Sequence, residues 1–155
     1  MLNLTKLQKI LLILTIIIAA IGFAGMQLSK FAVDSSLNNW EEGIAGYVSK
    51  MREQKQSDKP VALFFYTDWC PNCKKLREEI LASAEVQAFM KEVLPVKINP
   101  ESGPLENQLS EDYGVFGYPT VIIIPGKDKT PKTIRRTSNI TPAQFVQQCK
   151  QAIAT

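Results

Sequence analysis

Two cysteines three residues apart constrain this chain more than any other feature of its sequence. Cys70 and Cys73 lie shortly after residues 61–66, a continuous apolar and aromatic run that predicts a strand buried on both faces. Pro71 stands between them, and because proline is favoured at the first helical position, a helix is predicted to begin there. Cys70 is therefore expected at a helix N-terminus, where free N–H groups and the helix dipole stabilise a thiolate.

This placement predicts thiol-disulfide chemistry. Cys70 is expected to be the exposed nucleophile that attacks a substrate disulfide, and Cys73 the resolving thiol that breaks the mixed disulfide. Zinc sites also use such cysteine pairs, but the chain has three cysteines and no histidine, so it cannot complete a four-ligand zinc site of these residues. The lack of histidine also excludes His-based catalytic triads and Cys–His dyads.

Helical and strand patterns alternate along the rest of the chain. An amphipathic helix is expected from an apolar stripe at Leu37, Trp40, Ile44, Val48 and Met51, with Glu42 on another face. Further helices are predicted from Pro71, at 83–93, at 105–113 and from a Thr141 cap onward, and strands at 61–66, 94–98, 120–124 and 132–137. This order predicts an α/β sandwich with a mixed sheet. Cys149 falls on the apolar face of the last helix and is expected to be a buried structural residue.

An uncharged stretch of nineteen residues, 10–28, lies near the N-terminus. A helix that rises ~1.5 Å per residue over this length just spans a hydrocarbon core of ~30 Å. Lys6 and Lys9 precede the stretch, which favours a cytoplasmic N-terminus by the positive-inside rule. The predicted organisation is a cytoplasmic N-terminus at 1–9, a transmembrane anchor at 10–28, a linker at 29–36 and a globular domain at 37–155.

A cleaved signal peptide is the alternative interpretation of this segment. Gly22 and Ala24 are small residues at the offsets of a cleavage site, and cleavage there would give a secreted domain. The apolar run continues beyond this site to residue 28, which favours an anchor that is retained. We therefore expect a single-pass protein of the inner (cytoplasmic) membrane with its domain in the periplasm.

Charge excludes one class of partner. The first thirty residues hold three lysines and no acid, while the other 125 hold 15 basic and 15 acidic side chains. The net charge of +3 therefore belongs to the N-terminal segment, and the globular part is neutral. Because a nucleic-acid-binding domain is expected to show a basic patch, we expect no nucleic-acid partner.

Two motifs resemble the thioredoxin superfamily. The stretch FFYTDWCPNCK (64–74) resembles its active-site segment, and GVFGYPT (114–120) resembles its cis-proline loop. The order of motifs from 37 to 153 is similar to the C-terminal periplasmic thioredoxin-like domains of DsbD-type thiol:disulfide interchange proteins, here as a stand-alone, membrane-tethered protein. The resemblance implies a thioredoxin fold and a cis peptide bond before Pro119. It implies catalytic roles for Cys70 and Cys73, and substrate-binding or supporting roles for Trp69, Pro71, Asn72, Lys97, Tyr118 and Pro119.

The chain departs from the family pattern at two positions near the cysteines. Phe64 stands where a buried acid is usual, and Arg77 stands where the DsbD domains carry another acid. Lys97 matches the lysine that normally faces the buried acid, so it is expected to lack its usual partner. Both departures remove negative charge near Cys70, which predicts a lower thiol pKa; desolvation by Phe64 and Trp69 acts in the opposite direction.

The expected function is dithiol–disulfide exchange with extracytoplasmic proteins, without a metal or an organic cofactor. Protein thiols and disulfides are the expected substrates, together with a membrane or periplasmic redox partner that sets the direction of electron flow. One alternative is a non-catalytic thioredoxin-fold adaptor or chaperone that binds extended chains beside Pro119. Another is a tethered thioredoxin-like protein of the eukaryotic secretory pathway.

Overall fold

The structure, a computed structural model, describes residues 8, 12–18, 37–126, 128–134, 137 and 139–154. The chain divides into two units, Met1–Ser35 and Ser36–Thr155. In the first unit residues 12–18 are helical, and the rest of the predicted anchor at 10–28 lies outside the described residues. Among the residues described, no helix has both the length and the apolar character needed to cross a membrane.

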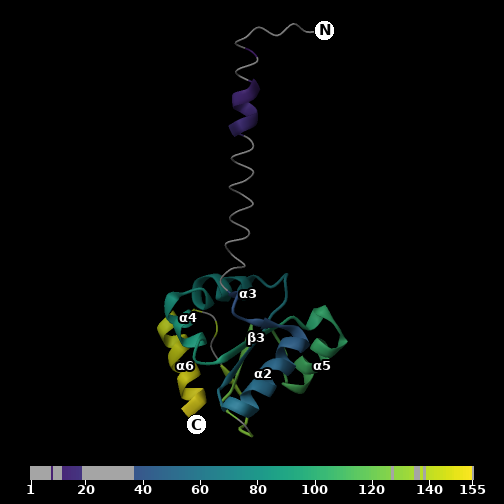
Figure 1. Cartoon of the computed structure of the whole chain (residues 1–155), viewed down its shortest axis with the longest axis vertical. Helices are drawn as coiled ribbons and strands as arrows, with labels where there is room; N and C mark the ends of the chain where they lie inside the picture. Colours follow the sequence, from purple (N-terminus) through teal and green to yellow (C-terminus); the bar gives the residue numbers. More distant parts are fainter. Residues whose placement is uncertain are drawn as a thin grey trace. The chain divides into compact units, whose positions relative to one another are not determined.

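The second unit is built on a five-stranded mixed sheet with strand order β1-β3-β2-β4-β5 (Figure 1). Its strands are β1 (Glu41–Glu42), β2 (Val61–Phe65), β3 (Leu94–Ile98), β4 (Thr120–Ile124) and β5 (Lys132–Ile134). Strand β3 is parallel to both β1 and β2, whereas β4 is antiparallel to both β2 and β5. The predicted mixed sheet of a thioredoxin fold is confirmed.

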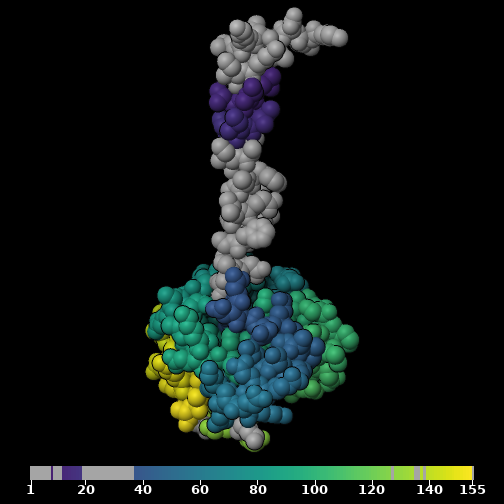
Figure 2. Space-filling view, in the orientation of Figure 1, coloured from purple at the N-terminus to yellow at the C-terminus, as the bar shows by residue number. Residues whose placement is uncertain are grey.

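Helices cover both faces of this sheet. They are α2 (Gly43–Ser57), α3 (Pro71–Lys75), the π-helical η2 (Leu76–Leu81), α4 (Ala84–Met90), the short 3-10 turn η3 (Pro100–Ser102), α5 (Pro104–Asp112) and α6 (Pro142–Ala154). One apolar cluster joins the sheet to α2 and α5, and the other joins it to α3, η2, α4 and α6. Figure 2 shows α2 on the near face of this unit, with α5 and α6 on opposite sides of it.

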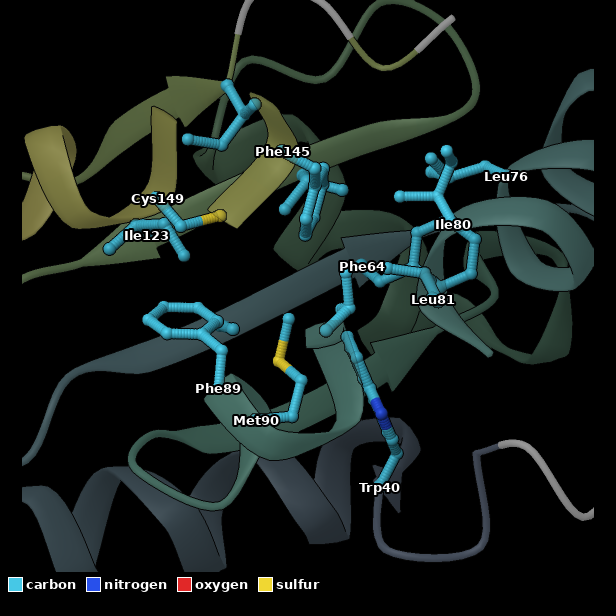
Figure 3. Packing of buried hydrophobic residues seen from close by; sticks show 14 of the residues in the cluster. Trp40, Phe64, Leu76, Ile80, Leu81, Phe89, Met90, Ile123, Phe145 and Cys149 are labelled. Atoms are coloured by element: carbon cyan, nitrogen blue, oxygen red, sulfur yellow. The ribbon is translucent and has the colours of Figure 1, made fainter. Parts of the chain in front are cut away.

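Strand β2 lies at the centre of both clusters. Side chains alternate between the two faces of a strand, so Leu63 and Phe65 contribute to one cluster while Phe64 contributes to the other. All five residues of β2 are at most 1% exposed, as the continuous apolar run predicted. In Figure 3, Phe64 lies among side chains of η2, α4 and α6, including Leu81 and Phe145.

The helix predicted to begin near Leu37 begins instead at Gly43, which has a φ of 65°. Leu37 and Trp40 are buried in the cluster that contains Phe64, whereas Ile44 and Met51 pack against the other cluster, and Val48 is 48% exposed. The prediction that these apolar residues form one stripe along a single helix is therefore wrong. The apolar residues lie on the two sides of the sheet because the short strand β1 separates them along the chain.

The C-terminal helix follows its sequence signals closely. The Thr141 hydroxyl accepts a hydrogen bond from the Gln144 N–H at 3.2 Å, and the Gln144 side chain accepts one from the Thr141 N–H at 2.9 Å. This reciprocal pair is a capping box, so the predicted Thr141 cap is confirmed. Cys149 is fully buried, and burial raises the pKa of its thiol to about 12.

Candidate active site

Cys70 and Cys73 form a disulfide at the beginning of α3. Cys70 is the N-cap residue, with an extended backbone, and Pro71 occupies the first helical position. The Cys70 Sγ accepts a hydrogen bond from the Cys73 N–H, with a nitrogen–sulfur distance of 3.1 Å. An N–H of the first helical turn therefore points at the sulfur, which is an arrangement that stabilises negative charge on it.

Both cysteines are nearly covered in this disulfide form. Cys70 is 5% exposed and Cys73 is 3% exposed, so the expectation of an exposed Cys70 is wrong for the oxidised protein. Each belongs to the cluster that also contains Tyr66 and Leu76. At the N-cap, the Cys70 sulfur lies against the backbone of the first helical turn, where it accepts the hydrogen bond from Cys73. Cys70 therefore differs from Cys73 in its position on the helix rather than in its exposure.

Trp69 lies on the surface beside the disulfide and is 68% exposed. Its indole N–H donates to a Glu101 carboxylate oxygen at 2.8 Å. The Glu101 backbone N–H donates to the Asn99 side-chain oxygen at 3.0 Å, and the Asn99 amide donates to the Asp68 carboxylate at 3.3 Å. These bonds fix the two residues before Cys70 to the segment that follows β3.

Sequence reasoning did not assign Asn99 or Glu101 to the site, although a signal was present. Strands β2 and β3 are parallel, so their carboxyl ends meet at one edge of the sheet. Polar residues directly after β3 are therefore neighbours of the residues directly after β2, which lead to the cysteines.

The cis-proline loop lies at the same edge of the sheet. The peptide bond between Tyr118 and Pro119 is cis, as the resemblance implied. Thr120 begins β4 and pairs with Phe65, the last residue of β2, so Pro119 is held next to the segment that leads to Cys70. Phe116, in the same loop, is fully exposed.

Lys97 lacks its usual partner, because its register neighbour on β2 is Phe64, but it pairs with a different carboxylate. Its Nζ lies 3.1 Å from the Glu42 Oε2, and the Tyr66 hydroxyl donates to the Glu42 Oε1 at 3.2 Å. Glu42 belongs to β1 and is the register neighbour of Lys97 on β3. The sequence pattern predicts Glu42 on a helix, so the sequence alone did not predict its ion pair with Lys97.

Phe64 fills the position at which the family usually has an acid. It is 1% exposed, stacks on Tyr66 with ring centroids 5.4 Å apart, and meets the Trp40 ring edge-on at 6.2 Å. Figure 3 shows Trp40 and Phe64 within the same group of buried side chains. Burial, together with the Glu42 carboxylate, raises the pKa of Tyr66 well above its usual value, so its hydroxyl remains a neutral donor.

A small cavity of about 60 Å³ adjoins Asn72, which stands between the two cysteines. Asn72 and Lys75 of α3 line it together with Leu76, Glu79, Ile80, Thr137, Asn139 and Ile140. The Thr137 hydroxyl also donates a long hydrogen bond of 3.5 Å to the Pro119 carbonyl oxygen. Over the residues that the structure describes, no group of three or more cysteine, aspartate or glutamate side chains is placed to hold a metal ion.

Comparison with known proteins agrees with this geometry. A family model described as a thioredoxin-like domain matches residues 47–153. The thiol:disulfide interchange protein DsbD 1 of Pseudomonas aeruginosa is 30% identical over 104 residues, which cover 66% of this chain and 17% of that protein. The disulfide bond reductase DsbH of Chlamydia pneumoniae is 36% identical over 100 residues, which cover 58% of each chain. The chain thus spans less than two thirds of the length of these relatives.

Solved structures give the same result. A DsbH oxidoreductase superposes with a TM-score of 0.64 and 25% identity, over 74% of this chain and 83% of that one. The oxidised C-terminal domain of Neisseria meningitidis DsbD superposes with a TM-score of 0.61 and 26% identity, over 73% of this chain and 98% of that domain. With its mixed sheet, its disulfide at a helix N-cap and its adjacent cis proline, this chain belongs to the thioredoxin-like domain family.

Proposed function

We propose that this protein is a membrane-tethered thiol-disulfide oxidoreductase that exchanges disulfides with proteins outside the cytoplasm. The observation that carries the proposal is the Cys70–Cys73 disulfide at the N-cap of α3, at the same sheet edge as the cis Pro119. The relatives named as thiol:disulfide interchange protein and disulfide bond reductase support this chemistry.

The reaction needs only the two cysteines and the substrate disulfide. In the reduced protein, the Cys70 thiolate attacks one substrate sulfur, forms a mixed disulfide and releases the other substrate sulfur as a thiolate. The Cys73 thiolate then attacks the Cys70 sulfur, which restores the Cys70–Cys73 disulfide and releases the second substrate thiol. Two electrons pass to the substrate, the protein is oxidised, and no metal or organic cofactor takes part.

Reduction of substrates is the direction that we propose. The relative from Chlamydia pneumoniae is named a disulfide bond reductase and is 36% identical over the matched region. An exported reductase must be reduced again after each turnover, so a dithiol protein in or at the membrane is the proposed electron donor. Its thiolate would attack the Cys70–Cys73 disulfide by the same exchange reaction.

Substrate chains are proposed to lie across Trp69 and the cis-proline loop. Trp69 and Phe116 are large side chains that are 68% and 101% exposed, so both are accessible to a bound chain. Trp69 is held by Glu101, and Tyr118 is packed against both apolar clusters, so this surface is firmly supported. Pro71 starts the helix, and Asn72 lines the cavity beside the disulfide.

We propose that residues 10–28 anchor the protein in the inner membrane, with residues 1–9 in the cytoplasm and the domain in the periplasm. The support is the uncharged stretch of nineteen residues preceded by Lys6 and Lys9. Partners that form mixed disulfides with the protein should then be exported proteins, and a set of exclusively cytosolic partners would contradict this placement.

Reduction of insulin by dithiothreitol, with the full chain in detergent, tests the proposed activity. The wild-type protein should accelerate insulin precipitation, and Cys70→Ser should return the rate to that of dithiothreitol alone because the nucleophile is gone. Cys149→Ala is the matched control, since Cys149 is buried away from exchange chemistry and its loss should leave the acceleration intact. No acceleration by the wild-type protein would contradict the proposed activity, and an adaptor or chaperone function would be favoured if a Cys70→Ser/Cys73→Ser variant still delayed the precipitation of reduced insulin as the wild type does.

A further inference from the structure

A groove of about 280 Å³ lies at the amino ends of strands β2 and β3. Its lining includes Lys59, two residues before β2, and Leu94, the first residue of β3. Lys50 of α2 and Lys91, the C-cap residue of α4, also line it. The volume is close to the lower end of the range of small-molecule sites, roughly 300–1,000 Å³. None of the residues that line the groove takes part in the exchange reaction.

The groove carries an excess of positive charge. Three lysines line it, Lys50, Lys59 and Lys91, against a single carboxylate, Glu53. The Lys50 ammonium lies 2.9 Å from the Glu53 carboxylate and is neutralised by it. Over the residues that the structure describes, neither Lys59 nor Lys91 forms an ion pair with a carboxylate. Two cations are therefore available to an anion, and the lysine ammonium is a common ligand of phosphate.

Apolar surface lies beside these charges, because Met90, Val93 and Leu94 also line the groove. A free inorganic anion gains nothing from apolar surface, whereas a phospholipid carries its phosphate next to a glycerol and the beginning of its acyl chains. Lysine side chains suit such a ligand, since their methylene stems lie along apolar surface while the ammonium reaches the polar group. The composition of the groove therefore favours an amphiphilic phosphate over the free ion.

The length of the linker keeps the groove within reach of lipid. Asn39 lines the groove and is the third residue after the predicted linker at 29–36. A fully extended residue spans at most ~3.6 Å, so the eight linker residues reach at most ~29 Å. With residues 10–28 in the membrane, the domain remains near the surface at which lipid headgroups are concentrated.

We propose that this groove binds the phosphate-containing headgroup of an anionic phospholipid, with Lys59 and Lys91 as its ligands. The inference rests on the proposed anchor at 10–28. Strands β2 and β3 are parallel, have five residues each and run from the groove toward the disulfide, which separates the two sites by roughly 16 Å at ~3.3 Å per residue. A lipid bound in the groove would therefore leave the disulfide uncovered for its substrates.

Acetylation of lysines in the full chain, reconstituted in lipid nanodiscs, tests the site. Discs of phosphatidylcholine alone are compared with discs that also contain phosphatidylglycerol, and mass spectrometry follows the modification of each lysine. Lys59 and Lys91 should react roughly threefold more slowly with phosphatidylglycerol present, as expected when about two thirds of the sites are occupied. Lys150, which is exposed on α6 and lies outside the groove, should react at the same rate in both kinds of disc.

Lys59→Gln and Lys55→Gln are the matched variants. The backbone N–H and carbonyl of residue 59 keep their hydrogen bonds in Lys59→Gln, so this variant should fold. It should weaken the protection of Lys91 by phosphatidylglycerol, because one of the two phosphate ligands is lost. Lys55→Gln removes an exposed charge of α2 outside the groove and should leave the protection of Lys91 intact.

Equal acetylation rates of Lys59 and Lys91 in both kinds of disc would overturn the inference. Equal slowing of Lys150 would also overturn it, because the effect would then belong to the charged surface in general. Equal protection by the same total concentration of inorganic phosphate in phosphatidylcholine discs would show that the groove takes the free ion instead. A chain that fails to copurify with the discs would contradict the anchor and this inference together, whereas a retained chain with unprotected lysines would contradict the lipid site alone.

Discussion

The three cysteines of this chain have the same chemistry and three different surroundings. Cys70 caps α3 and accepts a hydrogen bond from a backbone N–H, Cys73 lies within the first turn, and Cys149 is buried on α6. Burial raises the pKa of Cys149 to about 12, so it remains a neutral thiol at physiological pH. Position on a helix and local burial, rather than residue type, therefore decide which thiol can act as a nucleophile.

The reduced protein should have a Cys70 pKa below the free-thiol value of ~8.5, because the helix N-terminus stabilises the thiolate. Arg77 adds to this effect: it lies one helical turn beyond Cys73, and its Nε is buried without an acceptor within the described part of the chain. Arg77→Gln should raise the Cys70 pKa by about half a unit or more, since a partly buried charge is weakly screened. The ultraviolet absorbance of the thiolate, followed against pH, measures the Cys70 pKa.

Lys74→Gln is the control for this prediction, because the Lys74 side chain is 66% exposed and its charge is screened by solvent. Its effect on the Cys70 pKa should be smaller than that of Arg77→Gln. A wild-type Cys70 pKa above ~8.5 would show that desolvation outweighs the helix and charge effects.

At the scale of single elements, the sequence predicted what local patterns determine. Residues 61–66 read as a strand because they form a continuous apolar and aromatic run, and 94–98 and 120–124 read as short strands rich in apolar residues. Thr141 marked the beginning of α6 because its cap is local. The start of α2 was missed because Leu37 and Trp40 continue its spacing by coincidence while packing on the other face of the sheet. The pairing of β1 with β3 is what shows that the helix begins at Gly43 rather than near Leu37.

Helix α2 also depends on a long-range cap that no local pattern reveals. Its N-cap residue, Glu42, makes no side-chain capping bond, and the Ile44 N–H donates instead to the Glu106 carboxylate of α5 at 3.1 Å. Glu106→Ala should lower the free energy of unfolding by about 1 kcal/mol, because it removes the acceptor and the favourable charge at the helix N-terminus. Urea unfolding of the oxidised protein measures the change.

Glu111→Ala provides the comparison for Glu106. The Glu111 side chain accepts a hydrogen bond from Asn107 on the exposed side of the same helix, so its removal should cost at most a few tenths of a kcal/mol. Equal unfolding midpoints for Glu106→Ala and the wild type would show that the contact between α5 and α2 contributes nothing to stability.

At the scale of the whole molecule, the site is assembled at one edge of the sheet. The ends of β2 and β3 and the beginning of β4 meet there, which brings the cysteines, the Trp69–Glu101 contact and the cis proline together. The motifs predicted the cysteines and Pro119 because they are short and local. They could not predict Glu42, Asn99 or Glu101, which join the site only through strand pairing and loop contacts. The anchor at 10–28 stays a prediction.

Mixed-disulfide trapping in bacterial cells that express the full-length chain tests the central claim, that Cys70 exchanges disulfides with exported proteins and Cys73 resolves the intermediate. Cys73→Ser should accumulate adducts that dithiothreitol releases, because the resolving attack is lost, and the trapped partners should be exported proteins. Cys70→Ser should accumulate none. Adducts of equal abundance in Cys70→Ser, or their absence from Cys73→Ser, would contradict the assignment of the two cysteines.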